Sequence, residues 1–136
     1  MDKRKIESLM VKAEDALQES KLLSGPNKTE IKNSYNGQIA ALGVSVAMIG
    51  ILPTLAIYYQ DDKNGRQNVL NVIAHITKGQ SFNGRSLLEL AIKLKKDNRT
   101  IELKELAHQV MDASVALKQI VRTYKLVKEN ENHYEI

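Results

Sequence analysis

Histidines and paired aspartates are the residues of this chain best suited to catalysis or metal binding. The histidines His75, His108 and His133 stand too far apart to suggest a ligand set, and none belongs to an HExxH arrangement on a helix. The pair Asp61-Asp62 carries the oxygen ligands that hard cations prefer, but an adjacent pair in a polar segment more often solvates a turn. We therefore expect surface or boundary histidines and no metal site.

Other sequence signatures of catalysis are missing. The chain contains no cysteine, which excludes thiol nucleophiles, disulfides and cysteine-ligated zinc. It has no glycine loop of the GxGxxG or GxxxxGK type and no GxSxG elbow. We expect no enzymatic activity from this chain alone and no cofactor.

Cationic side chains are the remaining candidates for function. The net charge is +4, and residues 85–128 hold ten bases and five acids. Lys118, Arg122 and Lys125 follow one another at i, i+4 and i+7, so on a helix they form one stripe that could follow a phosphate backbone. Four further bases would extend this stripe if the fold brings them near it: Arg85, Lys93, Lys96 and Arg99. The alternative is an ordinary solvated basic face, with cations placed favourably near helix C-termini.

The positions of these cations depend on the fold, and the fold depends on where a long apolar run is buried. Residues 33–60 contain no Asp, Glu, Lys, Arg or His, and Ile39 to Tyr59 is almost wholly apolar. Such a run is typical of a membrane-spanning helix, or of the central helix of an all-helical domain. Pro53 fits best in the first turn of a new helix, so we expect the run to break at Gly50 and to continue as a short helix over 54–60.

The first of these two helices is expected to start at Asn27, which has Glu30 three places on in a capping-box arrangement. It has two different faces. Bulky residues recur on one side: Ile31, Tyr35, Ile39, Leu42, Val46 and Ile49. Small residues that would let another backbone come close recur on the other: Gly37, Ala40, Gly43, Ala47 and Gly50.

The rest of the chain also has helical periodicity. Amphipathic helices are predicted over 2–23, over 69–76 with an end at Gly79, and over 87–92 before Asp97-Asn98. Polar turns are predicted at Asp61 to Gly65 and at Asn83-Gly84. From Thr100 an apolar pattern of alternating three- and four-residue steps predicts one helix of nearly thirty residues that reaches Val127.

These elements predict an all-α fold: a compact, single-domain helical bundle of about six helices with a long C-terminal helix. The domain would cover residues 1–136, with a frayed tail over 130–136. The amphipathic helices need a centre on which to bury their apolar stripes, which favours a core role for Ile39 to Tyr59 over a membrane span. Residues 1–5 lead into an amphipathic segment, so we expect no cleavable signal and a cytoplasmic location.

Three segments of the chain are similar to a known family. They are Ser34-Tyr35-Asn36-Gly37 through Ala41, the Gly50 to Ala56 break, and Ala116 to Lys125. With the helix order and basic character, they resemble the small helical subunit of the Cmr complexes, which are type III-B CRISPR RNA-guided effectors. The likeness extends over nearly the whole chain, and its motifs are packing signatures.

The resemblance implies a non-catalytic structural subunit of an antiviral ribonucleoprotein. Its partners would be the other subunits of the Cmr effector complex, the guide and target RNA, and further copies of itself in a stack, with no membrane. It implies an RNA-binding role for Lys118, Arg122 and Lys125, which lie in the matching final segment. The alternatives are a helical protein-protein adaptor without RNA binding, and a single-span membrane protein that uses Ile39 to Tyr59.

Overall fold

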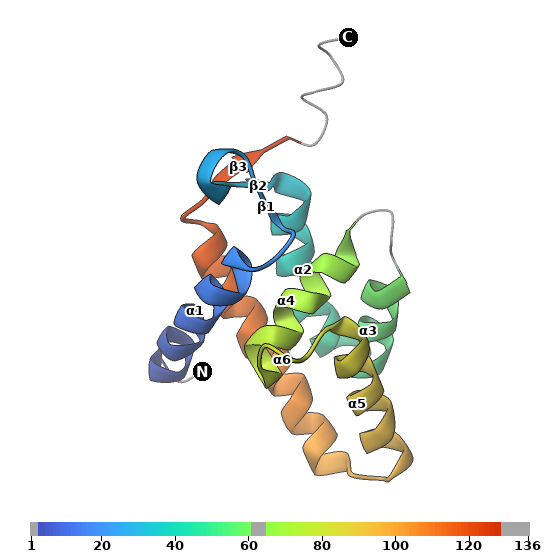
Figure 1. Ribbon diagram of the computed structural model, residues 1–136. Helices are drawn as coiled ribbons and strands as arrows, with labels where there is room; N and C mark the ends of the chain where they lie inside the picture. Colours follow the sequence, from blue (N-terminus) through green and yellow to red (C-terminus); the bar gives the residue numbers. More distant parts are fainter. Residues whose placement is uncertain (1–2, 61–64, 129–136) are drawn as a thin grey trace.

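Six α-helices form most of the molecule, with a small three-stranded sheet at one end (Figure 1). The structure is a computed structural model, and it describes residues 3–60 and 65–128. The elements follow in this order: α1 (Lys3–Gln18), β1 (Leu23–Ser24), the 3-10 helix η1 (Pro26–Lys28), β2 (Glu30–Lys32), α2 (Asn33–Ile49), α3 (Ile51–Gln60), α4 (Arg66–Lys78), α5 (Gly84–Lys96), α6 (Thr100–Val121) and β3 (Lys125–Val127). The predicted all-α bundle with a long C-terminal helix is confirmed.

Helix α6 is the element around which the others pack. It contacts α1, α2, α4 and α5, and it runs from the turn after α5 to the sheet (Figure 1). The core is aliphatic, and its largest fully buried side chains come from nearly every element: Leu17, Leu22, Ile31, Ile39, Leu42, Leu55, Leu70, Ile73, Leu87, Leu106 and Leu117. The apolar run therefore supplies α2 and α3 to a shared core, as the pattern of amphipathic neighbours predicts.

The predicted break in the apolar run is confirmed at Gly50. This residue has φ +95°, a left-handed conformation that suits glycine, and its N–H donates to the Val46 carbonyl at 3.0 Å. Pro53 lies in the first turn of α3, where its missing N–H costs no hydrogen bond. Because of the break, Ile39 to Tyr59 is not one span. In residues 3–60 and 65–128, no helix has the length and apolar character needed to cross a membrane.

The N-terminal connection differs from the prediction. Helix α1 ends at Gln18, and the capping box at Asn27 is wrong because Asn27 has φ 60° inside η1, while α2 begins at Asn33. Gly25 also has positive φ, so the chain reverses here and Leu23 pairs with Ile31 in antiparallel register. The strand that contains Ile31 pairs with both β1 and β3, so its backbone groups find partners there in place of a longer helix.

The C-terminal helix is shorter than predicted. It ends at Val121, and Lys125–Val127 forms β3, which pairs in parallel with β2 through Glu30↔Lys125, Ile31↔Leu126 and Lys32↔Val127. The two central helices match better: α4 ends at Lys78, with Gly79 (φ +105°) as its C-cap residue. The predicted turn at Asn83-Gly84 is only partly right, because Asn83 caps α5 and Gly84 is already its first residue. The predicted turn at Asp61 to Gly65 falls largely, and the predicted frayed tail wholly, outside the described residues.

Candidate nucleic-acid interface

The helical stripe predicted for three cations is only partly formed. Lys118 is half-buried in the last turn of α6, and Arg122 follows as its exposed C-cap residue. Lys125 is exposed and belongs to β3, so it leaves the helical spacing of the other two. The prediction that all three share one helix face is therefore wrong, although all three lie at the same end of α6.

Tyr124 explains why the helix stops. Its hydroxyl donates to Glu14 Oε1 at 2.7 Å and accepts from Gln18 Nε2 at 2.6 Å, which ties the chain after α6 to the end of α1. Burial, and then the hydrogen bond to Glu14, raise the pKa of Tyr124. The Lys125 N–H donates to the Thr29 carbonyl at 3.1 Å, next to the pairing of β3 with β2.

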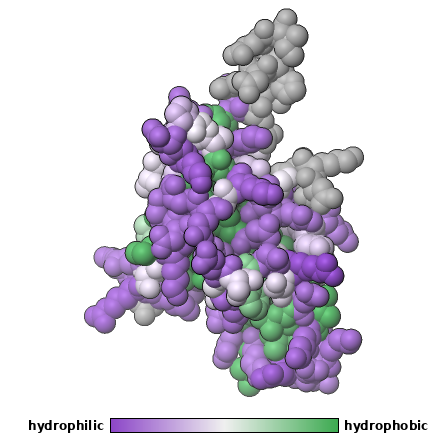
Figure 2. Space-filling view, in the orientation of Figure 1, coloured by the Kyte–Doolittle hydropathy of each residue, from purple (hydrophilic) through white to green (hydrophobic). Residues whose placement is uncertain are grey.

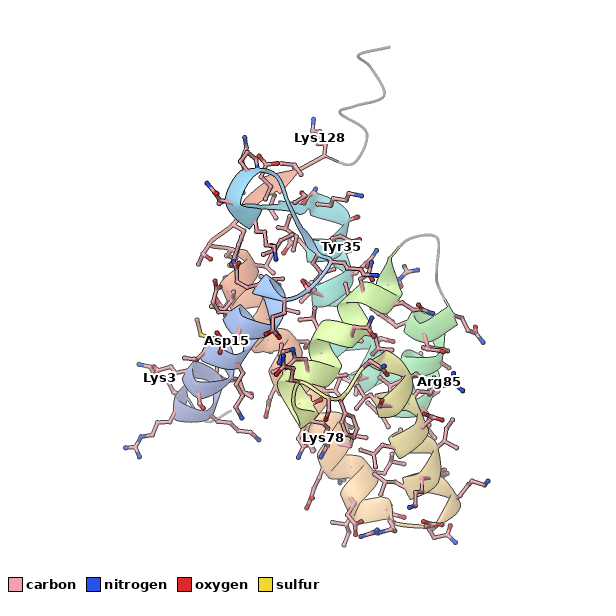
Figure 3. All side chains as sticks on the ribbon, in the orientation of Figure 1. Lys3, Asp15, Tyr35, Lys78, Arg85 and Lys128 are labelled. Carbon is pink, nitrogen blue, oxygen red and sulfur yellow. The ribbon has the colours of Figure 1, made fainter. Side chains whose placement is uncertain are left out.

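This strand brings Lys125 next to bases from a distant part of the sequence. Lys32 is exposed at the end of β2, and Lys128 follows β3 directly (Figure 3). We call Arg122, Lys125, Lys128 and Lys32 the sheet-end cluster. Glu30, which faces Lys125 in the register, partly offsets its charge.

The sequence argument missed Lys32 and Lys128 as members of this cluster. Lys32 is 93 residues from Lys125, and only the parallel pairing of β2 with β3 brings the two strands together. The available signals were the presence of Lys32 before the apolar run and the excess of bases over 85–128, neither of which specifies a neighbour. Lys28 is nearby in sequence, but its Nζ donates to the Gln18 carbonyl at 2.9 Å, a C-terminal contact on α1.

The other predicted cations lie elsewhere. Lys93 and Lys96 are in the last turn of α5, and Arg99 is the N-cap residue of α6 and pairs with Glu102. We call Lys93, Lys96 and Arg99 the turn cluster. Arg85 lies at the start of α5, where its Nε is 3.9 Å from Glu89 Oε2 (Figure 3).

Helix α6 separates the turn cluster from the sheet-end cluster. Its 22 residues span about 33 Å at 1.5 Å per residue. This is several times the screening length of about 8 Å at physiological ionic strength, so the two clusters act as separate charges. The predicted residues therefore do not form one patch, and an RNA that touched both clusters would have to extend along the whole of α6.

The histidines of the described residues are not part of a metal-binding group. His75 Nδ1 is 3.8 Å from Glu19 Oε2, His108 lies at a groove on α6, and His133 falls outside the described ranges. Over residues 3–60 and 65–128, no group of three or more His, Cys, Asp or Glu side chains is placed to hold a metal ion. The pair Asp61-Asp62 falls outside the residues that the structure describes.

A groove of about 780 Å³ lies between α2 and α6. The small-residue face of α2 contributes Ala40, Gly43 and Ala47, and α6 contributes Met111 and Val115. At Gly43 the two helices come close, because a Cβ added there would stand 2.7 Å from Ser114 Oγ. The small-residue face thus contacts α6 at Gly43 through the Ser114 side chain, and the close approach of another backbone stays a prediction. Much of the face shown in Figure 2 is hydrophilic.

Comparison with known proteins bears on the fold. No family model matches the chain, and no curated protein matches it. A solved structure does: a CRISPR-associated Cmr5 family protein from Thermus thermophilus, with a TM-score of 0.68 and 17% sequence identity. The match covers 92% of this chain and 99% of that one. The resemblance to the small Cmr subunit is thus confirmed at the level of the fold, which the two chains share over almost their whole length.

Proposed function

We propose that this chain is a non-catalytic structural subunit of a type III-B CRISPR ribonucleoprotein. The observation that carries the proposal is the end-to-end match to the Cmr5 family protein, because the match leaves neither chain with a large unmatched part. In this role the whole chain acts as one helical domain. It stacks with other subunits and helps to hold guide and target RNA through cationic side chains.

The sheet-end cluster is the favoured contact for RNA. The side chains of this cluster are all exposed: Arg122, Lys125, Lys32 and Lys128. Glu30 faces Lys125 alone, whereas Arg99 and Arg85 each have a carboxylate within ion-pair distance on their own helices. Lysine and arginine contacts to phosphate release counterions, so binding should depend steeply on salt and weakly on sequence. Lys118, on the last turn of α6, would extend the contact along the helix.

A salt series with matched variants tests this contact. The first variant carries Lys118→Gln, Arg122→Gln and Lys125→Gln, and the control carries Lys93→Gln, Lys96→Gln and Arg99→Gln, which removes the same charge at the other end of α6. Fluorescence anisotropy with a labelled single-stranded RNA and an RNA duplex measures the affinity, and circular dichroism measures the helicity.

The first variant should bind more weakly and reduce the slope of log K against log salt by about 0.7–0.9 per lost contact. The control should retain most of the affinity. Unchanged affinity in the first variant would remove these three residues from the site. Equal losses in both variants would mean that only the net charge matters.

An adaptor without RNA binding is the second candidate, and the apolar groove between α2 and α6 favours it. Such an adaptor would show no RNA affinity even at low salt. Purification of the native complex with sequencing of any bound RNA separates the two functions in the cell, since only the proposed subunit should bring guide RNA and other effector subunits with it.

A further inference from the structure

Strand β3 is the last strand of the sheet, and its outer edge is open. The strand order is β1-β2-β3, so among the described residues only β2 pairs with β3 as a strand (Figure 1). The Lys125 N–H donates to the Thr29 carbonyl at 3.1 Å, toward β2. Successive residues of a strand direct their N–H and C=O groups to opposite edges, so those of Leu126 point away from β2. Such an edge can pair with a strand of another chain.

Leu126 also leaves an apolar side chain partly uncovered at this edge. In the register of the sheet it lies beside Ile31, which is buried, whereas Leu126 itself is 42% exposed. Side chains in register share one face of a sheet, so Leu126 continues the core-facing row that Ile31 begins. A strand added at this edge would place one more side chain beside Leu126 and extend the apolar row.

The opposite face of the strand is cationic. Lys125 and Val127 direct their side chains to that face, and Lys32 is in register with Val127. The other two bases of the sheet-end cluster directly precede and follow the segment, and both are exposed. Glu30, in register with Lys125, is the one acid of the described strands on this face. An added strand would therefore meet an apolar neighbour on one face and an excess of bases on the other.

We propose that β3 accepts an extended acidic segment of a partner protein as an additional, antiparallel strand. A central apolar residue of that segment lies beside Leu126 and exchanges two backbone hydrogen bonds with it. The residues on either side of the apolar one are Asp or Glu, and one of them lies next to Lys125. The inference goes beyond the proposed function, because backbone pairing at β3 stands whether or not the chain binds RNA.

Nucleic acid and a second copy of β3 fit this edge less well. Phosphate groups only accept hydrogen bonds, so they would leave the outward carbonyl of Leu126 without a donor, and they carry no apolar group to cover its side chain. A second β3 would bring Lys125 and the neighbouring bases of two copies together, and like charges across a strand pair are destabilising. A peptide backbone supplies both a donor and an acceptor, and acidic side chains match the charge.

A set of labelled peptides tests the pairing on the full chain by fluorescence anisotropy. The first has the sequence Ser-Thr-Glu-Val-Glu-Thr-Ser, and two matched peptides carry one backbone N-methyl group, on the valine or on the glutamate after it. Methylation of the valine removes the N–H that faces Leu126 and should weaken binding at least about tenfold. Methylation of the glutamate alters an N–H that faces solvent and should weaken binding less than about twofold. Equal losses would overturn the proposal.

Charge and backbone contributions are measured separately. A peptide with lysine in place of both glutamates should not bind, and equal binding of this peptide would overturn the acidic character of the partner. Hydrogen exchange of the unaltered chain needs no variant: the amide of Leu126 should exchange at least about tenfold more slowly when the acidic peptide is added. No added protection at Leu126 would overturn the proposal. Leu126→Pro removes the outward N–H and the apolar side chain but not the Lys125 N–H, and it should weaken peptide binding at least about tenfold.

RNA binding and self-association separate the other occupants of the edge. Leu126→Pro removes no base, so it should leave RNA affinity within about twofold of the unaltered chain. Protection of the Leu126 amide by RNA but not by the acidic peptide would overturn the proposal, and so would a dimer in sedimentation that Leu126→Pro dissociates. Absence of RNA binding with intact peptide binding would contradict the RNA role alone. Absence of peptide binding with intact RNA binding would contradict the strand addition alone.

Discussion

The contact between Gly43 and Ser114 gives a sharp test of how α2 packs on α6. A Cβ added at Gly43 would stand 2.7 Å from Ser114 Oγ, closer than side-chain atoms approach one another, whereas Ser114 Cβ would be 3.9 Å away in ordinary contact. The obstacle is thus a single oxygen atom. That oxygen donates to the Met111 carbonyl at 2.7 Å, so it cannot rotate away without losing a hydrogen bond.

The magnitude follows from two opposing effects. Replacing a helix-interior glycine by alanine stabilises a helix by about 0.5–1 kcal/mol. Crowding a packed interface costs about 1–3 kcal/mol. Gly43→Ala should therefore lower the free energy of unfolding by about 1 kcal/mol in the native chain. With Ser114→Ala the oxygen is gone, and the same substitution should raise the free energy of unfolding by about 0.5–1 kcal/mol.

Urea denaturation followed by circular dichroism measures all four proteins of this double-mutant cycle. The expected coupling free energy is about 1.5–2 kcal/mol. The matched control is Gly37→Ala on α2, where an added Cβ meets no atom within 4 Å, so it should stabilise both backgrounds equally. A coupling below about 0.5 kcal/mol would refute the close approach of α2 and α6 at this point.

Two further predictions concern the hydrogen bonds of Tyr124 to α1 and the N-cap of α5. Tyr124→Phe removes the hydroxyl that bridges Glu14 and Gln18, and should lower the free energy of unfolding by about 1–2 kcal/mol at neutral pH. Because the folded state raises the pKa of Tyr124, that state holds more protons than the unfolded chain above about pH 10. Stability should therefore fall as pH rises from there, and Tyr124→Phe should make the fall shallower; an identical slope in a pH series of urea melts would contradict this role. Asn83→Ala removes an acceptor 2.9 Å from the Ser86 N–H and should cost about 1 kcal/mol, while Asn83→Ser should recover most of it.

Local signals in the sequence predicted the parts of the fold that depend on backbone chemistry. Gly50 followed by Pro53 predicted the division of the apolar run, because a left-handed residue and a proline in a first turn suit a break and a new start. Gly79 marked the end of α4 for a similar reason, whereas Asn83-Gly84 was predicted as a turn and the structure makes Asn83 the N-cap residue of α5. Such signals act within a few residues, so they predict helix ends without knowledge of which other segments pack against the helix.

The prediction failed where the same pattern permits two structures. Tyr124 and Val127 continue the helical spacing of α6, yet Tyr124 packs against α1 and Val127 lies in β3. A run of so few residues fits a helix or a strand equally well. Likewise Asn27 and Glu30 matched a capping box, but Glu30 to Lys32 pair with β1 and with the distant β3 instead.

The sequence by itself determined an aliphatic all-helical chain, its central break and the excess of bases in its C-terminal part, because composition, periodicity and turn residues depend only on local chemistry. Only the tertiary structure decided which charges act together. The pairing of β2 with β3 placed Lys32 on the strand beside that of Lys125, and the length of α6 kept the turn cluster apart from them. Distances between segments far apart in sequence are set by packing of the whole core, and no single segment contains that information.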